Sequence, residues 1–403
     1  MIISLVISAI LFLLILSIVV IIHESGHYFV AKKFGIKVEE FGFGFPPRAI
    51  GKKIGETIYS INFLPLGGFV KLYGEDEAGG GKVSAGVKKT ETKDLSRAFF
   101  ARPASERAAV IVAGVVMNLL LSFVVFYVFL FASGFKSKLP LIIPNNFIFA
   151  NQKTEQSVYA GLVEKGSPAQ ASGMVAGDKL LKVDGMNISS DDFFRNFVNN
   201  NRGKQVLVQW QSVDGTNQSK EIVPRVNPPK GQGAIGIGLF GYEEIDVSYD
   251  TPAQKIFSGI TYPINLLIYN LRGIAHIIGT SVHEKSITPV SENVSGPLGI
   301  FVVVGTVVAS SPNLKDLLLQ GLNIIGLISI SLAFFNVLPI PALDGGRLFF
   351  VLVELFTRKK INPNHEALIN NVAFIILLGM VILISIFFDL PKLSNYLGVI
   401  LKK

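Results

Sequence analysis

The chain has no cysteine and few charged residues, and both shortages restrict what it can be. Without cysteine it has no disulfides and no thiolate metal ligands, although its compartment stays open. Only 16% of its 403 residues are charged, whereas 50% are hydrophobic. That composition is typical of a membrane protein with a sizeable soluble part.

The net charge of +8 is spread along the chain rather than gathered into one basic stripe. A nucleic-acid-binding protein concentrates Lys and Arg on one face or helix. Scattered cations are more typical of residues that flank membrane spans. We therefore expect a lipid bilayer as the environment and no nucleic acid as a partner.

Four stretches are long and apolar enough to cross a bilayer, which takes roughly 20 residues as a helix. They are residues 1–33, 108–134, 317–340 and 367–390, followed by a tail at 391–403. The first lacks the basic start and the cleavage site of a signal peptide, which predicts a retained span. Residues 251–316 mix polar and apolar positions and predict amphipathic helices on the membrane surface. Whether these helices span or lie on the membrane stays open.

At the end of the first span, Glu24 stands between His23 and His27. Residues four apart share a helix face, so the two imidazoles can bind one metal ion while Glu24 handles a proton. The alternative is a pair of interfacial histidines, but ionisable residues inside a membrane segment are costly and usually functional. The pattern is that of zinc peptidases. It predicts one Zn²⁺ per chain and peptide-bond hydrolysis at membrane depth.

A third metal ligand is expected after the third span, where the sequence reads N-x-x-P-x-P-x-L-D-G-G and contains Asp344. Asp344 is the favoured ligand, and a helix N-cap is its alternative role. Glu354 and His365 are competing candidates. If four spans cross the membrane, a ligand after the third span lies on the same side of the membrane as His27. An arrangement with six spans places it on that side too and remains possible.

Residues 34–107 contain two glycine-broken strands, Val38–Phe45 and Thr57–Leu72, which are either an ordinary hairpin or an edge strand beside the metal. Glu75–Lys93 is expected to be a flexible loop.

The soluble region 135–250 contains a stretch that looks like a PDZ core, Gly166–Gly185, with further strands at Lys204–Val213 and Ala234–Leu239. A glycine-rich stretch, Gly231–Gly241, is either a plain strand end or a loop whose amides capture a C-terminal peptide.

These motifs together resemble the site-2 protease family of intramembrane zinc metalloproteases, of the bacterial regulator of sigma-E protease (RseP) type. The resemblance covers nearly the whole chain. It is carried by residues 23–27, 42–44, 64–71, 166–185, 295–300 and 336–346. It implies a polytopic α-helical membrane protein with about four transmembrane helices, a membrane-associated β element and an inserted α+β PDZ domain.

The resemblance also implies residue roles. His23, His27 and Asp344 would bind zinc, and Glu24 would be the catalytic acid–base. The loop with Asn336, Pro339 and Pro341 would hold the substrate backbone. The strands after the first span would form a membrane-reentrant β element that presents the substrate. The implied substrates are single-pass membrane proteins, such as anti-sigma factors, or remnant signal peptides.

The sequence departs from the family pattern at two places. It has one PDZ-like stretch where many relatives of this type have two. It reads Ala113-Gly114-Val115 ahead of Asn118, where the family has Ala-Gly-Pro. The departures bear on substrate gating and leave the expected chemistry unchanged.

The basic residues fall mainly in the first loop and after the third span, so both are expected in the cytoplasm. The expected location is the bacterial inner membrane, with the active site toward the cytoplasmic side and the PDZ domain outside. Two rivals are a zinc transporter and a non-catalytic PDZ scaffold. A transporter needs several ligand sites along a path, and a scaffold needs neither the HESGH nor the LDGG motif.

Overall fold

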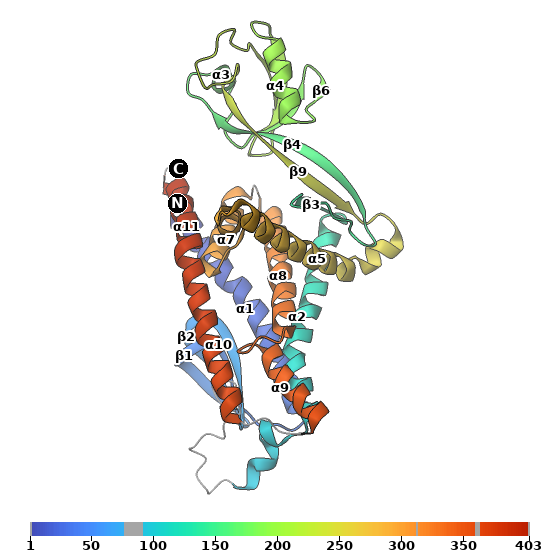
Figure 1. Cartoon of the computed structure of the whole chain (residues 1–403), viewed down its shortest axis with the longest axis vertical. Coiled ribbons are helices and arrows are strands. Elements are labelled where there is room, and N and C mark those ends of the chain that lie inside the picture. Colours follow the sequence, from blue (N-terminus) through green and yellow to red (C-terminus); the bar gives the residue numbers. More distant parts are fainter. Residues whose placement is uncertain (1, 76–91, 312, 359–362, 402–403) are drawn as a thin grey trace. The chain divides into compact units, whose positions relative to one another are not determined.

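The computed structural model describes residues 2–75, 92–311, 313–358 and 363–401. The expected flexible loop Glu75–Lys93 lies mostly outside these residues. The chain forms two compact units. The first unit contains residues 1–132, 259–309 and 317–403, and the second contains residues 133–258 and 310–316 (Figure 1).

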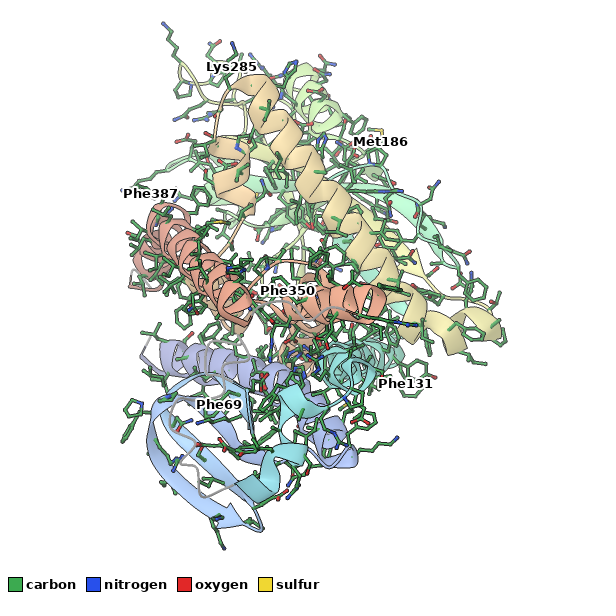
Figure 2. All side chains as sticks on the ribbon, turned by 60° about the horizontal axis from the view of Figure 1, so that its bottom comes forward. Phe69, Phe131, Met186, Lys285, Phe350 and Phe387 are labelled. Carbon is green, nitrogen blue, oxygen red and sulfur yellow. The ribbon has the colours of Figure 1, made fainter. Side chains whose placement is uncertain are left out.

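Within the described ranges, four helical segments are long and apolar enough to cross a membrane. They are α1 (Ile2–Lys33), α2 (Ala104–Ala132), α8 (Leu314–Val337) and the run from α10 (Pro363–Ile384) through a π-turn (Ser385–Asp389) into α11 (Leu390–Leu401). The residues expected as a tail therefore continue the last helix. Large apolar side chains on these helices, such as Phe131 and Phe387, are about two-thirds exposed, as suits a lipid-facing surface (Figure 2).

The region expected to hold amphipathic helices contains α5 (Pro252–Glu284), α6 (Thr288–Asn293) and α7 (Pro297–Ser310). The 33-residue α5 is not among the four segments that meet the length and hydropathy needed for a span. Helix α7 packs on α1 and α8 through a cluster formed by Phe12, Ile15, Val304 and Ile324.

Helices α1 and α2 approach each other closely at a glycine. A Cβ atom at Gly26 would lie 2.3 Å from the Ala113 carbonyl oxygen, so no larger residue fits there without movement. A second apolar cluster, including Ala31, Val110 and Val351, joins α1 and α2 to α9 (Asp344–Thr357). This packing fixes the parts of α1, α2 and α9 that carry the site residues.

In the sequence, α1 is followed by a bent antiparallel hairpin of β1 (Val38–Ile54) and β2 (Thr57–Leu72). Residues 38–43 of β1 pair on one side with residues 58–61 of β2 and on the other with residues 68–72. The far end of β1 pairs again with residues 57–62. Because both strands bend back, the hairpin has four paired segments in the order 68–72, 38–43, 57–62 and 48–54. Residues 68–72 therefore form one of its edges. Two short 3₁₀ helices, Thr92–Arg97 and Phe99–Ala101, precede α2.

The second unit is an antiparallel sheet in the order β3-β9-β4-β5-β7-β8, with β6 on β5. Its strands are β3 (Lys136–Pro140), β4 (Asn151–Val163), β5 (Lys179–Val183), β6 (Met186–Asn187), β7 (Val206–Gln211), β8 (Asn217–Ile222) and β9 (Ile237–Ser248). Two helices, α3 (Pro168–Ala171) and α4 (Asp191–Asn200), cover a core around the fully buried Trp210. The strand expected at Ala234–Leu239 begins later, at Ile237, and runs on to Ser248.

Candidate metal centre

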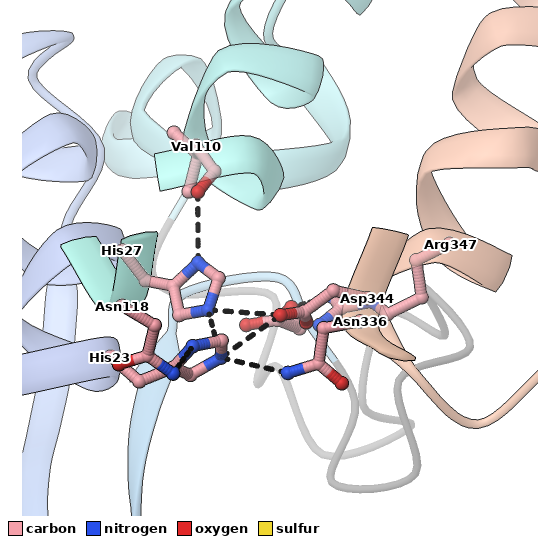
Figure 3. Close-up of polar contacts among 8 residues, drawn as sticks. His23, His27, Val110, Asn118, Asn336, Asp344 and Arg347 are labelled. Atoms are coloured by element: carbon pink, nitrogen blue, oxygen red, sulfur yellow. Dashed lines mark hydrogen bonds and ion pairs between the residues drawn. The ribbon is translucent and has the colours of Figure 1, made fainter. Parts of the chain in front are cut away.

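Three side chains from two distant parts of the sequence converge on one point (Figure 3). The Nε2 atoms of His23 and His27 are 3.2 Å apart, and they lie 3.0 and 3.4 Å from Oδ2 of Asp344. Among the residues that the structure describes, this is the one group of three or more His, Cys, Asp or Glu residues with metal-binding spacing. Two imidazoles and one carboxylate, with a fourth position open, are the donor set of catalytic zinc.

The position of Asp344 depends on a tight turn between α8 and α9. Ala342 has a positive φ of 73°, and its amide donates to Oδ1 of Asn370 on α10. A Cβ atom at Gly345 would lie 2.0 Å from the Leu338 carbonyl oxygen, and one at Gly346 would lie 2.4 Å from that of Ile340. The two glycines therefore let α9 start against the end of α8, which directs the Asp344 carboxylate at the histidines.

Asp344 does not fill its alternative role of helix N-cap, and the competing ligand candidates Glu354 and His365 lie elsewhere. The N-cap position of α9 is Leu343, and Asp344 is already inside the helix, so its carboxylate is not the cap. Glu354 forms an ion pair with Arg107 at 2.7 Å, which joins α9 to α2. His365 is exposed near the start of α10. These contacts leave Asp344 as the candidate third ligand.

Residues of helix α2 contact the Nδ1 atoms of both imidazoles, whereas the Nε2 atoms face Asp344. The Nδ1–H group of His27 donates to the Val110 carbonyl oxygen at 2.8 Å. On His23, Nδ1 lies 3.2 Å from the side-chain amide of Asn118, which is fully buried. A Cβ atom at Gly114 would lie 2.3 Å from His27 Nε2, so α2 approaches the centre closely only because this residue is glycine. The sequence drew attention to Gly114 and Asn118 only through the family pattern, although their spacing of four already put them on one helix face.

Glu24 lies in a cavity of about 200 Å³ that it shares with the three candidate ligands and with Phe69 and Val70 of β2. The Val70 amide hydrogen-bonds to the Glu24 carboxylate. A Cβ atom at Gly68 would lie 3.5 Å from Cγ of Glu24. The edge residues 68–72 thus run directly past Glu24, as the edge-strand interpretation of the first loop expected.

The remaining predicted residues lie on the α8–α9 side. Asn336 is buried, and its Nδ2 atom lies 3.5 Å from Nε2 of His23. Pro339 and Pro341 lie in the turn between α8 and α9. The sequence did not single out Arg347, which lines the same cavity as Glu24 and forms an ion pair with Glu75. No sequence motif separates this arginine from an ordinary helix residue.

The helices and this centre define a polytopic membrane protein with a metallopeptidase-type site. The chain belongs to peptidase family M50, whose model matches residues 11–380. The expected site-2 protease resemblance is thereby confirmed. The chain is a zinc metalloprotease of that family.

Full-length relatives align with almost the whole chain. A candidate zinc metalloprotease of Clostridium perfringens is 31% identical, covering 93% of this chain and 96% of its own. The zinc metalloprotease RasP of Geobacillus kaustophilus is 26% identical, covering 94% and 96%. The PDZ domain of an SdrC-like protein from Listeria monocytogenes is 28% identical and covers 20% of this chain and 85% of its own. Its TM-score is 0.19, too low to support a fold assignment.

Proposed function

We propose that this zinc metalloprotease cleaves single-pass membrane proteins at membrane depth, with His23, His27 and Asp344 as zinc ligands and Glu24 as general base and acid. The observation that carries the proposal is the convergence of three donor atoms beside Glu24, at the end of an apolar helix. The donor set and its open fourth position fit zinc.

A bound zinc ion supplies Lewis acidity toward water and toward the scissile carbonyl. The protein's own residues orient the reaction and move the proton. Glu24 accepts a proton from the attacking water and delivers it to the leaving amine. The Val70 amide and the packing of β2 hold the Glu24 carboxylate in the cavity.

The hairpin edge formed by residues 68–72 would present the substrate. A transmembrane helix is a poor substrate because its amides are hydrogen-bonded internally, so it must unwind locally. Freed backbone groups left unpaired in hydrocarbon cost several kcal/mol each. An added strand on the edge of β2 would satisfy them. Asn336, Pro339 and Pro341 would hold the substrate backbone from the α8–α9 side.

The distribution of Lys and Arg supports an inner-membrane orientation with residues 34–107 and 341–366 in the cytoplasm. The second unit, a PDZ-type domain, would then be extracytoplasmic and would bind C-terminal peptides. The proposed substrates are membrane proteins already trimmed on the outside, such as anti-sigma factors, or remnant signal peptides. The domain would act either as a filter against untrimmed proteins or as a recruiter of trimmed ones.

The substitution Glu24→Gln tests the catalytic assignment, because the amide keeps the shape of the side chain but cannot accept the proton. We expect about one zinc ion per chain in the purified variant and a loss of peptide cleavage of about 10²- to 10⁴-fold or more. The measurement combines zinc content with turnover on a panel of membrane-spanning peptides. Glu155→Gln, in the second unit, is the matched control and should cleave normally. Normal cleavage by Glu24→Gln would refute the assignment.

A further inference from the structure

The edge segment 68–72 of β2 binds two carboxylates through alternate backbone amides. Strand β1 pairs with one side of this segment. On the other side, the Val70 amide donates to the Glu24 carboxylate. The Leu72 amide donates to Oε2 of Glu75 at 3.4 Å. Amides two residues apart in a strand face the same way, so the two carboxylates take neighbouring positions along one edge. Both line the cavity that contains the candidate metal ligands.

The position of Glu75 is set by a tight turn at the end of β2. Its own amide donates to the Leu72 carbonyl oxygen at 3.1 Å, and Gly74 before it has a positive φ of 76°. The turn is held from outside, because the Tyr73 carbonyl oxygen accepts from the Phe99 amide at 2.8 Å. The turn thereby brings the Glu75 side chain back onto the edge at Leu72.

The second oxygen of Glu75 is bound by Arg347 of α9. The guanidinium forms an ion pair with Oε1, while Oε2 faces the Leu72 amide. Both side chains are largely buried, with exposed fractions of 10% for Glu75 and 23% for Arg347. A buried carboxylate needs partners of this kind. Because the two contacts use different oxygens, the Leu72 amide can be released while the ion pair persists.

The two carboxylates on the edge differ in what the proposed reaction needs from them. Glu24 is the acid–base, so its bond to Val70 keeps it in place. Glu75 takes no part in that chemistry, and its bond to Leu72 uses a backbone donor that an added strand requires. An amide left unpaired at membrane depth is costly. Glu75 therefore satisfies the Leu72 amide and at the same time stands where a substrate carbonyl would bind.

We propose that Glu75 competes with the substrate backbone for the Leu72 amide, and that Arg347 retains the Glu75 carboxylate when a substrate carbonyl displaces it. The proposal rests on the strand addition proposed above and adds the residues that control entry to the edge. Displacement exchanges one hydrogen bond to Leu72 for another and keeps the buried ion pair. The competition therefore raises KM and leaves the chemical step unchanged.

The first test measures kcat and KM of the full-length protein in detergent on a membrane-spanning peptide that it cleaves. Glu75→Ala removes the competitor and touches no reacting group. We expect its KM to fall about three- to tenfold, the effect of roughly one hydrogen bond, with kcat and zinc content unchanged. An unchanged or raised KM would overturn the proposal.

Two further variants separate competition from a structural effect. The double variant Glu75→Ala, Arg347→Met leaves no unpaired guanidinium in the cavity and should show the same fall in KM. Glu354→Ala breaks the other ion pair of α9, with Arg107, and is the matched control, so its KM should equal that of the unsubstituted protein. A loss of kcat or of zinc in both Glu75 variants would make the ion pair a support of the site and would exclude the competition.

Hydrogen exchange distinguishes this proposal from the strand addition on which it rests. The background is Glu24→Gln, in which the same peptide can bind without being cleaved. Bound peptide should slow amide exchange in residues 68–72 with either residue at position 75, and Glu75→Ala should speed exchange of that segment when no peptide is added. No slowing by the peptide would refute strand addition itself. Slowing by the peptide without an effect of Glu75→Ala would overturn only the competition.

Discussion

Each histidine of the candidate metal centre makes contacts through both of its ring nitrogens. Nε2 faces the other candidate ligands, and Nδ1 faces α2, through the Val110 carbonyl for His27 and the Asn118 amide for His23. Partners of this kind fix the tautomer and the orientation of a metal-binding imidazole. Oδ1 of Asn118 is buried without a hydrogen-bond partner. Turning the amide by 180° lets Oδ1 accept the Nδ1–H proton of His23, which would leave the Nε2 lone pair free to bind a metal ion.

Asn118→Ala should therefore weaken zinc binding about 10- to 100-fold without unfolding the protein. Chelator competition measures the affinity, and circular dichroism checks the helices. Asn323→Ala, in α8 and far along the chain from the turn that carries Asp344, is the control and should bind zinc normally. An unchanged affinity in Asn118→Ala would show that the amide does not orient His23.

At position 344 the choice lies between a carboxylate ligand and a residue that merely starts a helix. Asp344→Asn should lower zinc affinity and cleavage together, because a neutral amide is a far poorer ligand for a dication. We expect a loss of at least about tenfold in each. Glu354→Gln is the comparison, since its carboxylate pairs with Arg107, and it should keep its zinc. If Asp344→Asn keeps full zinc and activity, Glu354 and His365 become the residues to test.

At the scale of elements, the hairpin is tied to the end of α1 by a cluster of charges at its turn. Glu56 accepts two hydrogen bonds from Arg97, at 2.8 and 2.9 Å, and one from Lys32 at 2.6 Å. Arg97 and Lys32 hold the pKa of the Glu56 carboxyl at about 2, well below its usual value of 4.5. Because the folded pKa lies below the unfolded one, the stabilisation is complete above about pH 4.5 and is lost as the pH falls toward 2.

Glu56→Gln should consequently lower the stability of the folded protein near pH 7, by about 1 kcal/mol after allowance for the partly exposed side chains. The difference in stability between this variant and the unsubstituted protein should shrink as the pH falls from about 4.5 toward 2. Thermal unfolding of the two proteins in detergent, from pH 7 to pH 2, measures this difference. Glu155→Gln, which changes an exposed glutamate of the second unit, is the control. A difference that stays constant down to pH 2 would contradict the role of this carboxylate.

At the scale of the whole molecule, the candidate zinc ligands and Glu24 all belong to the first unit, whereas residues 158–241 belong to the second. Removing these residues of the second unit should leave zinc binding and the chemistry intact. Ser157 and Tyr242 are cross-strand partners, so residues 158–241 can be replaced by a short Asn-Gly turn. If the domain is a filter, this variant should cleave an untrimmed substrate several-fold faster and a trimmed one unchanged.

Zinc content and the cleavage of matched trimmed and untrimmed substrates decide between the two roles of the domain. A parallel loss of cleavage for both substrates, with zinc retained, would make the domain a recruiter. An insertion of the same Asn-Gly turn into the loop after Gly215, which leaves β4 and β9 untouched, is the control for the engineered turn.

The sequence by itself determined the helices of the first unit and the residues expected to bind metal. Uninterrupted apolar runs of span length have one stable form in a bilayer, and two histidines four residues apart share a helix face. The ends of these helices moved by only a few residues, except that the last one continues through a π-turn to Leu401. The two strands after the first span were also foreseen from their glycines and alternating residues.

Only the tertiary structure decided which residues surround these side chains. That β2 bends back to place residues 68–72 beside Glu24 depends on a register that no local pattern encodes. The roles of Val110, Asn118 and Glu354 follow from contacts between residues 83 to 247 positions apart. Local sequence fixes periodicity and turn chemistry. The partners of a side chain across such distances depend on how whole elements pack, which is a property of the folded chain.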